Sequence, residues 1–226
     1  MRKYSSSRNE PQQRIVVTFS CGDEVKYISH LDIMRLWQRA LRRAGMPVAY
    51  SQGFNSHPRI SIAAPLAVSV TSDGELMDVF LTRNASLDFF ARAVGEQLPQ
   101  GIQIKGIRET WLKLPSLQSQ LRFAEYRVEV ESSESPESIE SKIQSILQME
   151  SLPWQHARDK EIRSYDLRTL IEDLWLINQN EFGYALGMRL RNDSKGSGRP
   201  EQVALALGFP DTPRSIHRTM LILDRN

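Results

Sequence analysis

The feature that most constrains the fold is an order of strand and helix patterns that occurs twice along the chain. Residues 14–20 are rich in β-branched side chains and predict a strand, and residues 29–44 follow with the period of an amphipathic helix. The first round then continues with patterns for strand, strand, helix and strand, at 59–70, 75–82, 86–98 and 102–111. Ser72-Asp73-Gly74 predicts a hairpin turn between the two strands, and either Asn84 or Ser86 can cap the helix. This β-α-β-β-α-β order is typical of a ferredoxin-like domain.

The same order returns in the second half of the chain. Residues 125–131 alternate between apolar and charged side chains, and Ser135-Pro136 begins a helix pattern. The segment at 160–177 predicts strand with a short turn of helix at 167–171. A strand at 182–191, a short helix at 200–207 and a last strand at 216–223 complete the round. We therefore predict an α+β fold of two tandem ferredoxin-like (βαββαβ) domains. The predicted boundaries are a disordered lead-in at 1–13, an N-terminal domain at 14–113, a linker at 114–123 and a C-terminal domain at 124–226.

Composition excludes several classes of protein. The 226 residues contain one cysteine, Cys21, which excludes an internal disulfide and an iron–sulfur cluster held by several thiolates of this chain. A lone cysteine fits a reducing compartment, and no apolar run is long enough to span a bilayer, so we expect a cytoplasmic protein with no membrane partner. We also expect no secretory signal in the polar N-terminus. The net charge is only +2, so any argument for nucleic acid has to come from local clustering of charge.

Positive charge clusters on one face of the predicted helix at 29–44. Ser29 and Asp32 form a helix start signal, and Gly45 and Pro47 end the helix. A stripe about 100° wide, opposite the apolar face, carries Arg35, Arg39, Arg42 and Arg43. Guanidinium groups bind phosphate or carboxylate through paired hydrogen bonds, so the stripe indicates an anionic ligand. An ordinary solvated helix face is the open alternative.

The loop at 51–59 combines residue types that are common in binding sites. Its candidate binding residues are Gln52, Gly53, Phe54, Asn55, His57 and Arg59. The ring of Phe54 would suit base stacking, and together with the arginine stripe the loop predicts a site for RNA or another anion. An ordinary turn is the alternative.

A second candidate is the glycine-rich, basic run at 194–200. It contains Lys195 and Arg199, leads into a helix N-terminus and has a shape that suits an anion. It lacks the spacing of a Walker sequence, and a plain flexible loop remains the alternative.

Two histidines, His30 and His57, are the candidate catalytic residues. As one base and one acid beside arginines, they would suit metal-free RNA cleavage. The alternative is that their ring hydrogen bonds help to hold the local structure. No recognised metal-ligand spacing is present, so we expect no metal site.

Motifs across most of the chain resemble those of the bacterial "radical SAM-linked" family of uncharacterised proteins. They are S-H-L-D at 29–32, R-A-x-R-R-A-G at 39–45, Y-S-x-G-F-N-x-H-P at 50–58, P-L at 65–66 and G-x-G-R-P-E at 196–201. Ser56 departs from the family, which commonly has proline there. The resemblance implies an association with a radical SAM protein. The chain has no C-x-x-x-C-x-x-C motif, so the iron–sulfur cluster and S-adenosylmethionine would belong to that partner and this chain would hold no cofactor.

The sequence therefore predicts an RNA- or anion-binding accessory module that works with a radical SAM enzyme, in RNA modification or ribosome-related metabolism. We expect no enzyme activity from this chain alone. Two alternatives stay open: a metal-independent ribonuclease that uses His30 and His57, and a purely structural partner subunit.

Overall fold

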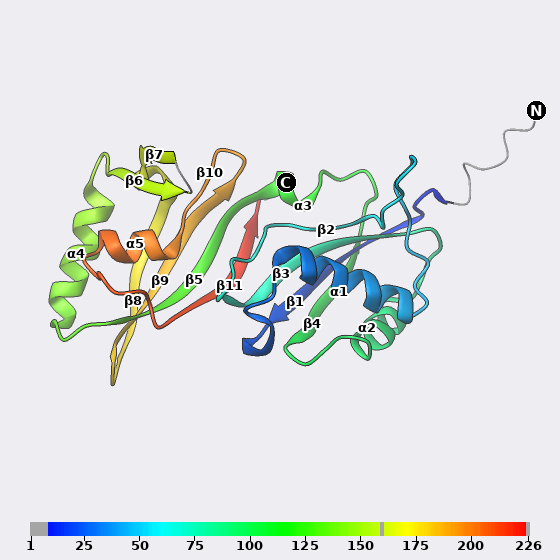
Figure 1. Ribbon diagram of the computed structural model, residues 1–226, viewed down its shortest axis with the longest axis horizontal. Helices are drawn as coiled ribbons and strands as arrows, with labels where there is room; N and C mark the ends of the chain where they lie inside the picture. Colours follow the sequence, from blue (N-terminus) through cyan, green and yellow to red (C-terminus); the bar gives the residue numbers. More distant parts are fainter. Residues whose placement is uncertain (1–8, 159–160, 225–226) are drawn as a thin grey trace, which may run out of the picture. The chain divides into compact units, whose positions relative to one another are not determined.

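The computed structural model describes residues 9–158 and 161–224. The chain divides into two compact units, Met1–Gln120 (unit 1) and Leu121–Asn226 (unit 2), and both mix helices with β-sheet (Figure 1). The predicted mixture of α and β structure is confirmed at this level. Residues 1–8 of the predicted lead-in lie outside the described residues, whereas Gln13 already belongs to the first strand.

Unit 1 follows the predicted order of elements. They are β1 (Gln13–Cys21), the short helix η2 (Asp23–Val25), α1 (His30–Arg43), β2 (Ile60–Ile62), β3 (Thr71–Leu81), α2 (Leu87–Gly95), β4 (Ile102–Thr110) and α3 (Leu117–Gln120). The sheet order within the unit is β4-β1-β3-β2, and each neighbouring pair is antiparallel.

One predicted turn in unit 1 is wrong. Ser72-Asp73-Gly74 reads as a hairpin turn, but these residues lie inside β3, which begins at Thr71. Ser72 is buried and its hydroxyl accepts a hydrogen bond from the Gly74 N–H, so the polar side chain is satisfied within the strand. The predicted strand at 59–70 is correspondingly short, because only Ile60–Ile62 pairs with β3.

Helices α1 and α2 share one hydrophobic core with the sheet of unit 1. Alternate residues of β1 turn Ile15, Val17 and Phe19 toward this core, where the Phe19 and Trp37 rings meet edge to face at 5.0 Å. Helix α2 contributes the fully buried Phe90. The core therefore fixes which face of α1 is buried and which face is left for solvent.

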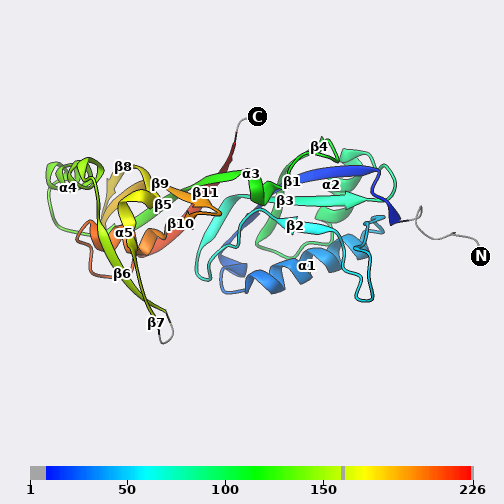
Figure 2. The ribbon, with the colours of Figure 1, turned by 90° about the horizontal axis from the view of Figure 1, so that it is seen from above.

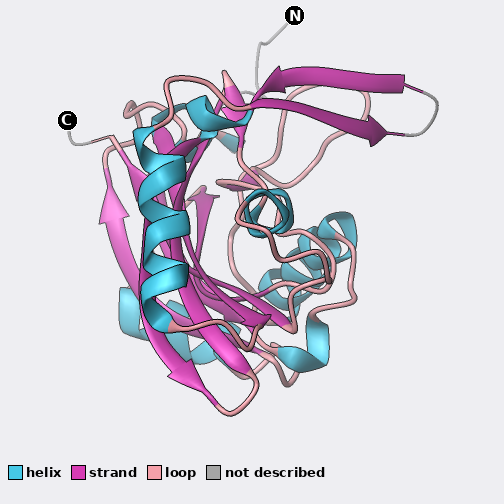
Figure 3. Cartoon of the chain, turned by 90° about the vertical axis from the view of Figure 1, so that its left-hand side faces the viewer, coloured by secondary structure: helices cyan, strands magenta, loops and turns pink. Residues whose placement is uncertain are grey.

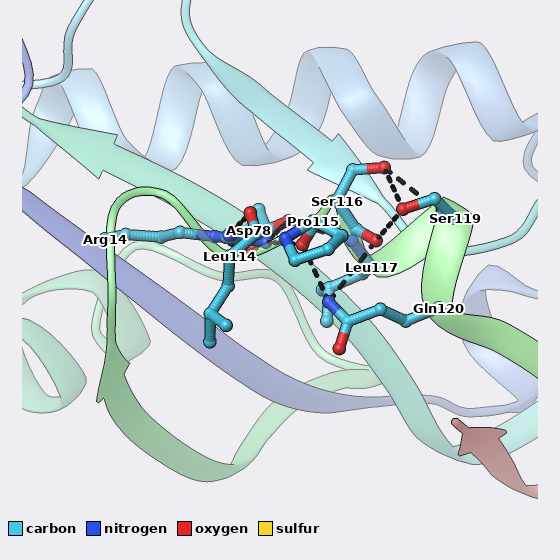
Figure 4. Close-up of polar contacts among 8 residues, drawn as sticks. All are labelled: Arg14, Asp78, Leu114, Pro115, Ser116, Leu117, Ser119 and Gln120. Carbon is cyan, nitrogen blue, oxygen red and sulfur yellow. Dashed lines mark hydrogen bonds and ion pairs between the residues drawn. The ribbon is translucent and has the colours of Figure 1, made fainter. Parts of the chain in front are cut away.

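The segment after β4 is held on unit 1 by a buried ion pair (Figure 4). Arg14 on β1 donates to both carboxylate oxygens of Asp78 on β3, at 2.8 Å each, and both side chains are about 1% exposed. The same guanidinium donates to the carbonyls of Leu114 (2.6 Å) and Pro115 (2.9 Å). The predicted linker at 114–123 is thus anchored at its start and continues directly as α3 and then β5.

Unit 2 repeats the same order with a hairpin inserted. Its elements are β5 (Leu121–Glu131), α4 (Pro136–Gln148), β6 (Pro153–Arg158), β7 (Glu161–Asp166), the short helix η3 (Leu167–Leu170), β8 (Ile171–Asn180), β9 (Gly183–Asp193), β10 (Gly196–Ser197), α5 (Pro200–Ala206) and β11 (Ser215–Leu223). Within the unit the sheet order is β11-β5-β9-β8, again antiparallel, with β10 also paired to β9.

The segment at 160–177, predicted as strand with a short turn of helix at 167–171, is found as β7, η3 and β8. Its first strand, β7, pairs with β6 in an inserted hairpin, which the sequence pattern did not indicate. Asp166 ends β7, because its side chain accepts the Leu152 N–H (2.8 Å) and the Arg168 N–H (3.0 Å). The two strands of the hairpin project from the rest of unit 2 (Figures 2 and 3).

Candidate anion-binding surface

The start of α1 is fixed by the capping residues that its sequence predicts. The Ser29 hydroxyl accepts the Asp32 N–H at 3.2 Å and donates to the Asp32 carboxylate at 2.7 Å. Arg35 in turn donates to Asp32 at 2.9 Å. The hydrogen bond from Ser29, followed by that from Arg35, holds the pKa of Asp32 below its ordinary value. Arg35 is therefore already paired with a carboxylate that stays ionised.

The other arginines of the stripe differ in how far they are engaged. Arg43 donates to the Gln97 carbonyl at 3.0 Å, just beyond the end of α2. Arg39 and Arg42 are exposed, and among the residues whose side chains the structure describes neither guanidinium group forms a hydrogen bond or an ion pair. These two guanidinium groups keep their hydrogen-bonding capacity for a ligand.

The loop at 51–59 is a narrow projection on a rigid base. At its neck the Ser51 N–H donates to the His57 carbonyl (2.8 Å) and the His57 N–H donates to the Ser51 hydroxyl (3.0 Å). The Asn9 side chain forms two hydrogen bonds with the backbone of Tyr50 and so holds the residue that precedes the loop. Gly53 has a φ of +130°, a conformation that only glycine adopts readily.

The tip of the loop places its side chains in solvent. The Phe54 ring is fully exposed, at 106% of its reference area, and Gln52, Asn55 and His57 are exposed around it. Arg59 lies at the base, with its guanidinium 4.5 Å from the centre of the Phe80 ring. An exposed aromatic ring on a constrained loop suits stacking against a flat apolar ligand such as a base.

The arginine stripe and the loop share one end of unit 1. The loop follows the C-terminal end of α1 after a few residues, and its base is joined to the end of β3 by the Val48–Leu81 bridge and the Ala49 N–H to Phe80 carbonyl bond of 2.8 Å. In Figures 1 and 2 the loop and the C-terminal end of α1 lie toward the same end of unit 1. We name the exposed arginines of α1 and the loop at 51–59 together the helix–loop surface.

The two histidines are not brought together. His30 is the first residue of α1 and lines a cavity of about 20 Å³, the size of a water molecule, with Val70 and Glu75. His57 lies in the loop at the other end of α1, and a rise of about 1.5 Å per residue makes that helix about 20 Å long. General acid–base catalysis by a pair needs both groups within hydrogen-bonding reach of one substrate. The arrangement that the ribonuclease alternative requires is therefore not found.

Lys195 and Arg199 lie in unit 2, on a groove of about 370 Å³. The backbone N–H groups that an anion cradle needs are already used there: those of Lys195 and Gly196 bond to the Asp193 carboxylate at 2.7 and 3.2 Å. The Gly198 N–H bonds to the Arg191 carbonyl at 2.8 Å. These three backbone N–H groups are therefore engaged within the loop, and the side chains of Lys195 and Arg199 remain as candidate binding groups.

Sequence reasoning missed two residues of this groove, Arg163 and Tyr165. They stand two positions apart on β7, so they share one face of that strand. The spacing of Arg163 and Tyr165 is visible in the sequence. It could be interpreted only once the pairing of β7 with β6 was known, because the pairing shows that the segment is a strand of a hairpin.

In the described part of the chain, no cluster of three or more His, Cys, Asp or Glu side chains is placed to hold a metal ion. No helix in that part is both long and apolar enough to cross a membrane.

The fold and these surfaces define a mixed α/β protein of two units that exposes cationic side chains beside aromatic rings. The family model of an uncharacterised protein conserved in bacteria, DUF2344, matches residues 14–200. The chain belongs to this family. No curated protein matches it by sequence.

Among solved structures, the chain is similar to chains of three complexes, at low identity. A chain of a Cbf5-Nop10-Gar1 complex is 9% identical, with a TM-score of 0.49, and the match covers 95% of this chain and 49% of that one. A chain of an H/ACA RNP bound to a substrate RNA is also 9% identical, with a TM-score of 0.45, and the match covers 92% of this chain and 46% of that one. A chain of an archaeal box H/ACA sRNP Nop10-Cbf5 complex is 9% identical, with a TM-score of 0.44, and the match covers 96% of this chain and 50% of that one. This chain spans about half the length of each of these three chains.

Proposed function

We propose that this protein is an RNA-binding accessory module of a radical SAM enzyme, and that it contacts RNA through the helix–loop surface. The observation that carries the proposal is that two exposed guanidinium groups, on Arg39 and Arg42 of α1, and a fully exposed ring, on Phe54, belong to one helix and the loop that follows it. Cations that neutralise phosphates and a ring that stacks on bases are the usual elements of a single-strand binding surface.

In this proposal both units are ferredoxin-like domains. The support is that each unit has the β-α-β-β-α-β order around an antiparallel sheet, β4-β1-β3-β2 in unit 1 and β11-β5-β9-β8 in unit 2. The β6–β7 hairpin is then an insertion into the second domain.

The partner is a radical SAM protein that acts in RNA modification or ribosome-related metabolism. The support is the resemblance of the motifs at 29–32 and 50–58 to the radical SAM-linked family, and both motifs build the helix–loop surface. Cys21 is buried, so this chain offers no accessible thiolate for a cluster, and the cluster and S-adenosylmethionine belong to the partner.

The RNA contact is tested by binding of a labelled single-stranded RNA at several salt concentrations. The variant Arg39→Ala/Arg42→Ala loses two phosphate contacts, so the slope of log K against log salt should fall by about 1.4, at about 0.7 per phosphate. A matched control is Arg108→Ala/Lys113→Ala, which removes the same charge from β4 and the segment after it. If the two variants lower the slope equally, or if the intact protein binds no RNA, the helix–loop surface is not an RNA site.

The partner is tested by co-purification with a radical SAM protein from the same cell, before and after ribonuclease treatment. We expect the complex to form and Phe54→Ala to weaken its joint binding of RNA. A complex that forms with no affinity for RNA in either protein would identify this chain as a structural subunit instead.

A further inference from the structure

A groove in unit 2 gathers positive charge around an aromatic ring. Its lining includes Arg163 and Tyr165 from β7, Lys195 and Arg199 on either side of β10, and Gln202 from α5. Arg163 and Lys195 are exposed, and neither side chain has a hydrogen bond or ion pair among the residues whose side chains the structure describes. The volume of about 370 Å³ falls at the small end of the range for small-molecule sites.

The acidic and backbone groups of the groove are already committed. Asp166 accepts N–H groups of Leu152 and Arg168, and the bond from Leu152 is the main reason that the pKa of this carboxyl lies below its ordinary value. The backbone N–H groups of Lys195, Gly196 and Gly198 are also bonded internally. The charge that a ligand meets is therefore the set of cationic side chains, because the Asp166 carboxylate is occupied by the two N–H groups.

Tyr165 is fixed in the groove by a neighbour from α5. Its hydroxyl donates to the side-chain oxygen of Gln202, which is only 8% exposed. Burial raises the pKa of Tyr165, although Arg199 opposes this, so the hydroxyl stays protonated and keeps this hydrogen bond. The ring is thus held in one place by a buried partner.

The loop that carries Lys195 is also held close to the groove floor. A Cβ at Gly196 would lie 2.7 Å from a methyl of Leu170, and a Cβ at Gly198 would lie 3.0 Å from the Leu170 carbonyl oxygen. Glycine at both positions permits this close packing against η3. The spacing of the cations across the groove is therefore set by packing.

We propose that this groove binds one nucleotide, with its phosphate between Arg163, Lys195 and Arg199 and its base against the ring of Tyr165. The guanidinium fork matches phosphate oxygens, and the ring offers a stacking face to any base. The nucleotide is either free or a unit of a single strand, since both present the same phosphate and base. All of these residues lie in unit 2, so the inference is independent of the helix–loop surface.

Calorimetric titration of the full chain distinguishes the sources. The probes are the nucleoside monophosphates, the matching nucleosides, inorganic phosphate and a short single-stranded RNA. We expect saturable binding of at least one monophosphate, weaker binding of phosphate and still weaker binding of the nucleoside. Tighter binding of the oligonucleotide than of every monophosphate would assign the site to a strand, and the reverse order would assign it to a free nucleotide.

Variants then locate the binding. Arg163→Ala/Lys195→Ala should weaken the monophosphate about a hundredfold, at about tenfold for each cation, whereas Arg108→Ala/Lys113→Ala should leave it unchanged. Tyr165→Phe keeps the ring and should change affinity less than Tyr165→Leu, which removes it. Circular dichroism checks that each variant is folded.

Two results would overturn the inference: no saturable binding of any monophosphate by the folded protein, or an equal loss in the control variant. Arg39→Ala/Arg42→Ala should still bind the monophosphate. Loss of RNA binding in that variant therefore tests the helix–loop surface alone, and the two proposals can fail separately.

Discussion

Replacing Asp78 by Asn should strongly destabilise unit 1, because it leaves a buried guanidinium without its counter-ion. Arg14 is 1% exposed and makes two 2.8 Å bonds to the Asp78 carboxylate. The substitution keeps the volume of the side chain, removes its charge and puts a donor where one acceptor oxygen was. The guanidinium cannot lose its proton, so the charge stays buried.

The expected cost follows from the completeness of that burial. Breaking a buried pair by removing one partner costs about 3–5 kcal/mol. The carbonyls of Leu114 and Pro115 still accept from Arg14, at 2.6 and 2.9 Å, which keeps the estimate within this range and not above it. For a protein of this size, 1 kcal/mol lowers the melting temperature by about 2–4 °C, so the shift should be about 6–20 °C.

Urea unfolding followed by tryptophan fluorescence measures the change as a shift in midpoint at constant slope. The double variant Arg14→Met/Asp78→Leu, which removes both charges, should recover most of the loss, because apolar replacement of a buried pair is often neutral. Arg35→Ala breaks an exposed pair with Asp32 and serves as the control, with an unchanged midpoint.

Hydrogen exchange gives a local readout of the same pair. The Leu117 N–H approaches Asp78 at 3.4 Å, and Leu114 and Pro115 are held by Arg14, so the amides of 114–120 should lose protection first. An Asp78→Asn protein with the wild-type midpoint and unchanged exchange in this segment would refute the reasoning.

Three further predictions concern the sites. The pKa of Asp166 lies below its ordinary 3.8, so its contribution to stability is present above pH 3.8 and is lost as the pH falls through the lower pKa of the folded state. Urea midpoints measured against pH should show this loss of stability at acid pH in the wild type and not in Asp166→Asn. Gly198→Ala should lower the free energy of unfolding by about 1–3 kcal/mol, because its new methyl group would meet the backbone carbonyl of Leu170. Gly196→Ala should cost less, since its methyl group would meet a movable methyl of the Leu170 side chain, and thermal melts of both variants test this order. Phe54→Ala should leave the melting temperature unchanged, since the ring is fully exposed, while it weakens RNA binding by about 1–3 kcal/mol in a fluorescence titration; the opposite pattern would make Phe54 a structural residue.

Local patterns were sufficient for the helices. Ser29, Ser86 and Ser135 each cap a helix where the sequence predicts a start, and α1 ends at Arg43 just before Gly45. A cap bonds to a backbone group only three residues away, and the helix period is set by neighbours three and four residues apart. Such contacts are available to sequence reasoning before any tertiary structure is known.

Strand pairing was less accessible, because it joins residues that are far apart in the chain. Ser72-Asp73-Gly74 has the composition of a turn and yet lies inside β3, and β6 was not predicted at all. Whether such a segment turns or extends depends on the partner strand that is available to it.

What the sequence determined about this protein is the order of its elements, the face of α1 that carries the arginines and the composition of the loop with Phe54. The tertiary structure alone decided which charges meet: it buried Arg14 against Asp78, placed His30 and His57 at opposite ends of α1, and brought Arg163 and Tyr165 to the same groove as Lys195. The physical reason is the separation along the chain over which each kind of interaction acts. Periodicity and capping act over one helical turn, whereas the burial of a charge and the assembly of a site depend on contacts between residues that the chain separates by tens of positions.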